Sequence, residues 1–201
     1  LVQPSTKVYV DPKNVDLLRV GEFLAEHIEG AIGHKPEVIR RKPKKKETNL
    51  IYLTLKTKND TLGAEGYTLQ VKEGRITLAA KEAHGAFLGI QTVRQLLPTQ
   101  KTTGSALIPA LEIVDKPRYT WRGMHLDVTR HFFPVEFVKQ YIDYLAMHKL
   151  NIFHFHPTED ISWRLQSKKY PQLTDPQHML RNKGAYYSER EIKELIQYCK
   201  D

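Results

Sequence analysis

This sequence has almost no cysteine: Cys199 is the only one among its 201 residues. One cysteine excludes an internal disulfide framework and any zinc site built from cysteine ligands. Long apolar runs are missing too, so we expect no membrane span, and no signal-peptide pattern opens the sequence. Hydrophobic residues at 40% and charged residues at 27% exclude a disordered or collagen-like chain. The length fits one large globular domain or two small ones.

Acidic residues are outnumbered: 31 Lys and Arg against 23 Asp and Glu give a net charge of +8. Six of the cations lie within seven residues, from Arg40 to Lys46, and Pro43 interrupts them. No aromatic residue lies among them to stack on bases, and Pro43 disfavours a basic helix. The pattern favours a solvated surface loop over a nucleic-acid patch, and we expect no nucleic-acid partner.

Residues 1–118 carry alternating strand and helix patterns. Two amphipathic helices are expected, one capped by Asn14 and ended near Gly33, the other over residues 83–97. A hairpin turn with Gly74 at its positive-φ position joins two of the strands. The expected strands are residues 7–10, 50–55, 66–71, 75–80 and 107–114. Together these elements predict a small α+β domain, a sheet with two helices.

Residues 119–201 follow a different pattern, in the order strand, helix, strand, long loop and helix. Strands are expected over residues 121–128 and 151–156, with an amphipathic helix between them. Ser188 caps the last helix, and Glu191 three residues later completes a capping box. Such a βαβα unit implies parallel strands joined by a right-handed crossover, with the chemistry at the carboxyl ends of the strands.

The densest polar clustering in the chain lies where these two strands end. Its members are Asp127, Arg130, His131, His154, His156, Glu159, Asp160, Trp163 and Arg164. The residues alone allow three interpretations. The first is a metal site, since His154 and His156 point the same way from their strand and carboxylates lie nearby. Two such histidines are at least as often hydrogen-bonded core residues.

The second interpretation is a hydrolase with a carboxylate pair, but the adjacent Glu159 and Asp160 would face apart on an extended segment. The third is a sugar-binding pocket, in which Arg130 donates to vicinal hydroxyls and Glu159 accepts from hydroxyls. Trp163 would stack on a pyranose face in such a pocket, although taken alone it is more typical of a core aromatic residue.

The same residues resemble the opening of the catalytic barrel of family 20 glycoside hydrolases, the β-N-acetylhexosaminidases. The stretches that carry this resemblance are 122–134, 141–151, 153–160, 163–164, 168–174 and 184–193. Upstream, residues 66–97 resemble the family's non-catalytic α+β domain, and residues 113–119 resemble its junction with the barrel. The resemblance covers almost the whole chain and is weakest over about the first sixty residues.

The resemblance implies a fold and a domain organisation. An α+β accessory domain at residues 1–118 is followed, at residues 119–201, by the first two βα units of a (β/α)8 TIM barrel. Two strands cannot close a barrel, so the second strand would expose one edge and apolar residues such as Phe153 and Phe155. Such an open barrel edge would allow self-association.

The resemblance also implies an activity. Members of the family hydrolyse the bond to a terminal β-linked N-acetylglucosamine or N-acetylgalactosamine with retention of the anomeric configuration, assisted by the substrate's own acetamido group. The catalytic Asp-Glu pair of the family follows the fourth barrel strand, so we expect no catalytic residue in this chain and no activity from the 201 residues alone. The resemblance implies no metal and no cofactor, and a secreted, periplasmic or surface location fits it.

Two substrate-binding residues carry over from the family motifs. Arg130 matches the arginine that hydrogen-bonds the outer hydroxyls of the terminal sugar, although a salt bridge with Asp127 would also explain it. Glu159 matches the first of the family's paired aspartates and is longer than it by one methylene. Two other functions stay open: a non-catalytic carbohydrate-binding or scaffold module, and a metal-dependent hydrolase that uses His154 and His156.

Overall fold

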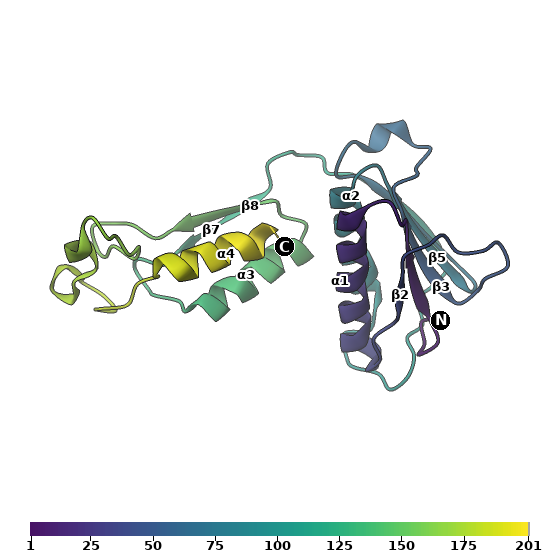
Figure 1. The fold of residues 1–201 in the computed structure, drawn as a ribbon, viewed down its shortest axis with the longest axis horizontal. Coiled ribbons are helices and arrows are strands. Elements are labelled where there is room, and N and C mark those ends of the chain that lie inside the picture. Colours follow the sequence, from purple (N-terminus) through teal and green to yellow (C-terminus); the bar gives the residue numbers. More distant parts are fainter. Residues whose placement is uncertain (201) are drawn as a thin grey trace. The chain divides into compact units, whose positions relative to one another are not determined.

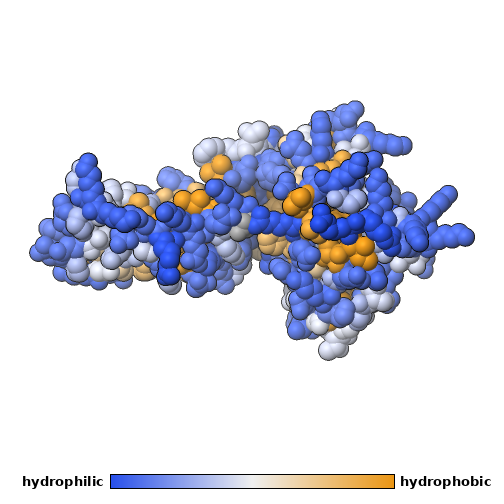
Figure 2. Space-filling view, in the orientation of Figure 1, coloured by the Kyte–Doolittle hydropathy of each residue, from blue (hydrophilic) through white to orange (hydrophobic). Residues whose placement is uncertain are grey.

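The computed structural model describes residues 1–200, and they form two compact units. The first unit is Leu1–Arg118 and the second begins at Tyr119. Figure 2 shows hydrophilic residues over most of the visible face of each unit, with hydrophobic residues confined to a few patches. Among the described residues, no helix combines the length and the apolar character that crossing a membrane requires.

The first unit is a mixed six-stranded sheet covered by two helices (Figure 1). The strand order is β2-β1-β3-β5-β4-β6, and β4 pairs antiparallel with both of its neighbours while the other pairs are parallel. Helices α1 and α2 lie side by side against the sheet. The elements are β1 (Lys7–Val10), α1 (Val15–Ile32), β2 (Val38–Ile39), β3 (Leu50–Thr54), β4 (Tyr67–Lys72), β5 (Arg75–Ala80), α2 (Ala83–Leu96) and β6 (Leu111–Asp115), with a short 3-10 helix at Asp60–Leu62.

Local sequence signals place the ends of these elements. The Asn14 side chain accepts a hydrogen bond from the Leu17 backbone N–H at 2.8 Å, which confirms the predicted cap of α1. Gly33 ends this helix with φ at 75°, and Gly74 turns β4 into β5 with φ at 66°. The last strand begins at Leu111 rather than at the predicted residue 107, because Pro109 has no N–H to donate to a sheet ladder.

The basic segment from Arg40 to Lys46 forms a loop that is anchored at one point. The Arg41 guanidinium donates to both carboxylate oxygens of Glu47, at 3.0 and 2.6 Å, and lies 4.9 Å from the centre of the Tyr9 ring. The hydrogen bond from Arg41 lowers the pKa of Glu47 to about 2. The remaining cations of the segment are exposed: Arg40, Lys42, Lys44, Lys45 and Lys46.

The second unit contains two parallel strands, β7 (Gly123–Asp127) and β8 (Ile152–His156). Helices α3 (Val135–Met147) and α4 (Glu189–Lys200) pack against each other, and the long connection before α4 holds two 3-10 turns, Pro171–Thr174 and Pro176–His178. The predicted capping box of α4 is confirmed: the Ser188 N–H donates to Glu191 at 2.7 Å, and the Glu191 N–H donates to the Ser188 hydroxyl at 3.2 Å.

Phe153 and Phe155 correct one expectation about this unit. Both are partly buried against the core formed by Val128, Val138, Tyr187 and Leu195, and are not fully exposed on an open strand. The alternation of β8 explains this, because it points both phenylalanines to the helix side and His154 and His156 to the other face. On α4, Leu195 is buried, whereas Ile196 is 50% exposed because it follows Leu195 by about 100° around the helix.

Candidate functional site

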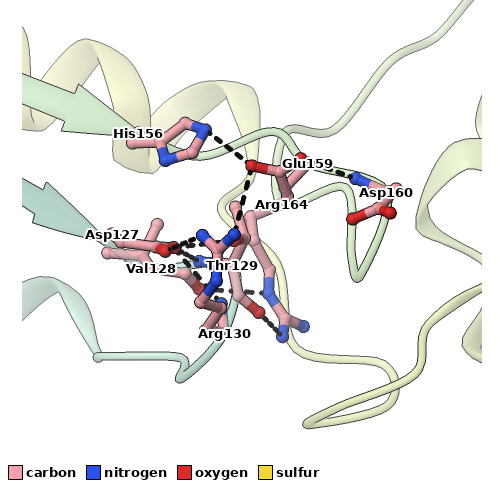
Figure 3. Close-up of polar contacts among 8 residues, drawn as sticks. All are labelled: Asp127, Val128, Thr129, Arg130, His156, Glu159, Asp160 and Arg164. Atoms are coloured by element: carbon pink, nitrogen blue, oxygen red, sulfur yellow. Dashed lines mark hydrogen bonds and ion pairs between the residues drawn. The ribbon is translucent and has the colours of Figure 1, made fainter.

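The carboxyl ends of β7 and β8 bring the predicted polar residues together. Asp127 and His156 are directly paired across the two strands, so both strands end at the same level. The loop after β7 carries Arg130, and the loop after β8 carries Glu159 (Figure 3). Parallel strands with a helical crossover place their following loops on one edge, which is where sites in such sheets lie.

Arg130 lies between two carboxylates. Its Nη1 forms a hydrogen-bonded ion pair with Oδ2 of Asp127, and its Nη2 is 3.6 Å from Oε2 of Glu159. The hydrogen bond to Asp127 is the main reason that the pKa of Arg130 is raised above its ordinary value. The side chain is still 48% exposed, and a guanidinium has five N–H donors. The group is therefore charged, held in place, and able to donate further hydrogen bonds to a ligand.

Asp127 organises the turn that follows β7. Its Oδ1 accepts from the Thr129 N–H at 2.8 Å, from the Thr129 hydroxyl at 2.6 Å and from the Arg130 N–H at 3.3 Å. Burial alone would raise the pKa of Asp127, but the hydrogen bonds from Thr129 and Arg130 outweigh it and hold this pKa well below its usual range. Asp127 is thus a stable anion that fixes both the backbone and the guanidinium of Arg130.

Glu159 connects β8 to Arg130. Its Oε2 lies 3.5 Å from Nε2 of His156 and 3.6 Å from Nη2 of Arg130. The neighbouring Asp160 is exposed and approaches Glu159 only through its backbone N–H, at 3.5 Å from Oε1 (Figure 3). The two adjacent carboxylates therefore lie in different surroundings, and only that of Glu159 faces the strand ends.

Three imidazoles share the face of the strands that lies away from the helices. The ring centroids of His125 and His154 are 4.7 Å apart, and those of His125 and His156 are 5.3 Å apart. His125 was missed in the sequence interpretation, although its alternation with Asp127 along β7 was a signal for it. Within residues 1–200, no group of three or more His, Cys, Asp or Glu side chains is arranged to hold a metal ion.

The remaining members of the predicted cluster lie apart from this group. His131 is exposed, and Trp163 is partly buried, with its indole N–H donating to the Leu165 carbonyl at 2.8 Å. Arg164 has no exposed surface and lies behind the strand ends, where burial lowers its pKa. The sequence suggested that Trp163 and Arg164 belong to the polar cluster, but it did not reveal that Arg164 is buried.

Comparisons with known proteins agree on one family. The description "Glycosyl hydrolase family 20, domain 2" matches residues 1–116, and "Glycosyl hydrolase family 20, catalytic domain" matches residues 119–201. Among curated relatives, a beta-hexosaminidase of Porphyromonas gingivalis is 37% identical over 197 residues, covering 92% of this chain and 24% of its own length. The beta-hexosaminidase subunit beta of Homo sapiens is 31% identical over 176 residues, covering 83% of this chain and 30% of its own length.

Solved structures agree with this result. The β-N-acetylhexosaminidase of Streptomyces coelicolor aligns with 99% of this chain and 40% of its own chain, with a TM-score of 0.85 and 33% identity. A mutant β-hexosaminidase of Streptomyces plicatus, solved with its product GlcNAc, aligns with 100% of this chain and 40% of its own, with the same TM-score of 0.85 and 33% identity. The chain spans about a quarter of the length of the first curated relatives that it matches.

Proposed function

Since this chain belongs to glycosyl hydrolase family 20, we propose that it supplies the accessory domain and the terminal-sugar side of the active site of a β-N-acetylhexosaminidase. Its fold is an α+β domain followed by the first two βα units of the barrel. The proposed ligand is a carbohydrate with a terminal β-linked N-acetylhexosamine. The observation that carries the proposal is the half-exposed Arg130 held between Asp127 and Glu159 at the strand ends.

The geometry suits recognition of sugar hydroxyls. Vicinal hydroxyls present oxygen acceptors that match the planar fork of a guanidinium, and two of the donor nitrogens of Arg130 already face carboxylates. Asp127 keeps the guanidinium from rotating freely, so less side-chain entropy is lost when the sugar binds. Glu159 supplies acceptor oxygens for a hydroxyl proton beside the same guanidinium.

We assign binding, and no catalytic step, to these residues. The family resemblance implies that the general acid and the acetamide-orienting carboxylate follow a later strand, and neither has a counterpart at its family position within the 201 residues. Arg130 and Glu159 would hold the ring of the terminal sugar while those groups act on its anomeric carbon and acetamide. A correctly held sugar is what makes intramolecular attack by the acetamido oxygen efficient.

The test uses the full-length protein to which these residues belong. The wild type should hydrolyse a chromogenic β-N-acetylglucosaminide or β-N-acetylgalactosaminide. Arg130→Ala should lose a charge-assisted contact of about 1.5–3 kcal/mol, which is about a 10- to 150-fold fall in kcat/KM. A matched control is Lys168→Ala, which removes an exposed cation paired with Glu189 at 2.6 Å and should leave kcat/KM unchanged. If Arg130→Ala kept the full kcat/KM, Arg130 would be structural and this assignment wrong.

A further inference from the structure

Arg164 is a buried cation whose partners are all uncharged. It has no exposed surface, and no carboxylate of the described part of the chain pairs with it. Instead, its five N–H donors each meet one backbone carbonyl at 2.8–3.2 Å: Nε meets Val128, Nη1 meets Asn182 and Ala185, and Nη2 meets Thr129 and Arg181. Only a guanidinium has five donors in a fixed plane, since a lysine ammonium has three.

Two of these hydrogen bonds hold the turn that carries Arg130. The peptide between Thr129 and Arg130 is fixed on both sides: its carbonyl accepts from Nη2 of Arg164 at 2.8 Å, and its N–H donates to Oδ1 of Asp127 at 3.3 Å (Figure 3). The orientation of this peptide sets where the Arg130 side chain begins. Thr129 itself is fully buried, so no water replaces Arg164 at its carbonyl from the solvent side.

The backbone of Arg164 also closes the loop that carries Glu159. Its N–H donates to the Pro157 carbonyl at 2.8 Å, and inside this closure the Glu159 N–H donates to the Ser162 carbonyl at 3.3 Å. One residue therefore sets the positions of both proposed sugar-binding side chains, Arg130 through its guanidinium and Glu159 through its backbone. The other three carbonyls, at residues 181–185, tie the long connection before α4 to the same point.

We propose that Arg164 is a positioning residue for recognition of the terminal sugar: its guanidinium fixes the Thr129–Arg130 peptide and thereby aims Arg130. This proposal rests on the proposed function of Arg130. Arg164 touches no ligand itself, because it has no exposed surface. A displacement of about 1 Å at a contact residue is enough to cost up to about a hundredfold in rate, so a change at Arg164 should reach the substrate through Arg130.

The main variant is Arg164→Lys in the full-length protein that contains this chain. It keeps the charge but has donors for at most three of the five carbonyls. We expect kcat/KM to fall about tenfold or more, with most of the change in KM. In an Arg130→Ala background the same substitution should change kcat/KM by less than about twofold, because the guanidinium that Arg164 positions is then absent.

Two further variants separate positioning from folding. Leu145→Ala empties a buried site on the last turn of α3, where the Leu145 carbonyl accepts from Leu150 just before β8 begins, away from the strand ends. It should lower the unfolding temperature and leave kcat/KM within about twofold. If Arg164→Lys does not fold, Arg164→Gln takes its place, since it retains two N–H donors and leaves no charge in the buried site.

Hydrogen exchange gives a readout that does not depend on catalysis. In the Arg164 variant, backbone amides of residues 127–130 should exchange about tenfold faster, while those of residues 1–118 should be unchanged. Unchanged exchange at residues 127–130 would overturn the proposal. So would an Arg164→Lys effect on kcat/KM that is equally large in the Arg130→Ala background, because that result indicates a general structural role. A wild type without any hexosaminidase activity would overturn the proposed function, and the exchange comparison would still decide whether Arg164 fixes this turn.

Discussion

Replacement of Asp127 by Asn tests the central anion of the site. The carboxylate accepts three hydrogen bonds at Oδ1, from the Thr129 N–H, the Thr129 hydroxyl and the Arg130 N–H, and one at Oδ2 from the Arg130 guanidinium. An asparagine can keep its oxygen at the Oδ1 position. Its amide nitrogen would then face the Nη1 of Arg130, so two donors would meet and the ion pair would be lost.

The expected magnitude follows from that one lost contact. A hydrogen bond between charged groups is worth about 1.5–3 kcal/mol. The Asp127 side chain is 20% exposed and that of Arg130 is 48% exposed, so solvent screens the pair and the lower half of this range applies. We expect Asp127→Asn to lower the free energy of unfolding of the second unit by about 2 kcal/mol at pH 7.

In the 201-residue chain, tryptophan fluorescence during urea unfolding reports on the second unit, because both tryptophans of these residues, Trp121 and Trp163, lie in it. The pKa of Asp127 is lowered in the folded state, so its contribution is fully present above the ordinary carboxyl pKa of about 4 and is lost as the pH falls through the folded pKa. The difference in unfolding free energy between the wild type and Asp127→Asn should therefore be largest near neutral pH and disappear in strong acid.

A matched control is Asp160→Asn, which neutralises an exposed carboxylate in the neighbouring loop and should change the unfolding free energy by less than about 0.5 kcal/mol. A gap below about 0.5 kcal/mol for Asp127→Asn at pH 7 would refute the reasoning, because the charge-assisted contact would then contribute nothing measurable. A gap that stays constant into strong acid would refute the linkage to the Asp127 carboxylate.

Three other predictions concern capping, the basic loop and activity. Ser188→Ala should lower the unfolding free energy of the second unit by about 1 kcal/mol, because the Glu191 N–H loses its acceptor; a change below the error of urea titration would contradict the role of the capping box. Glu47→Gln should speed tryptic cleavage between residues 40 and 46, because Arg41 loses its paired carboxylate; mass spectrometry of early cleavage products measures this, and an unchanged site order would count against an anchored loop. The 201 residues alone should turn over a chromogenic β-N-acetylglucosaminide at less than about 0.1 s⁻¹, a hundredth of a typical kcat of about 10 s⁻¹, and a faster rate would place a general acid among residues considered structural.

Much of the local structure follows from the sequence, because short-range signals carry it. The cap at Asn14, the turn at Gly74 and the capping box at Ser188 depend on backbone groups within three residues of each other, so the sequence alone predicts them. Hydrophobic periodicity likewise predicts most helices and strands. It misses β2, since a strand of two residues, Val38–Ile39, is too short for any period to be seen.

The candidate site, too, could be predicted only in part from the sequence. The rule that parallel strands carry their chemistry at their carboxyl ends, together with the motif resemblance, was enough to select Arg130 and Glu159 from the sequence. The tertiary structure alone decided which neighbours they have. In the sequence, Arg164 is one more polar residue of the cluster. In the structure, five carbonyls from separate segments surround it, and only the folded chain brings those carbonyls together. The register between β7 and β8 likewise places His125 beside His154 and His156. A strand's sequence specifies its alternation but not the partner strand opposite it.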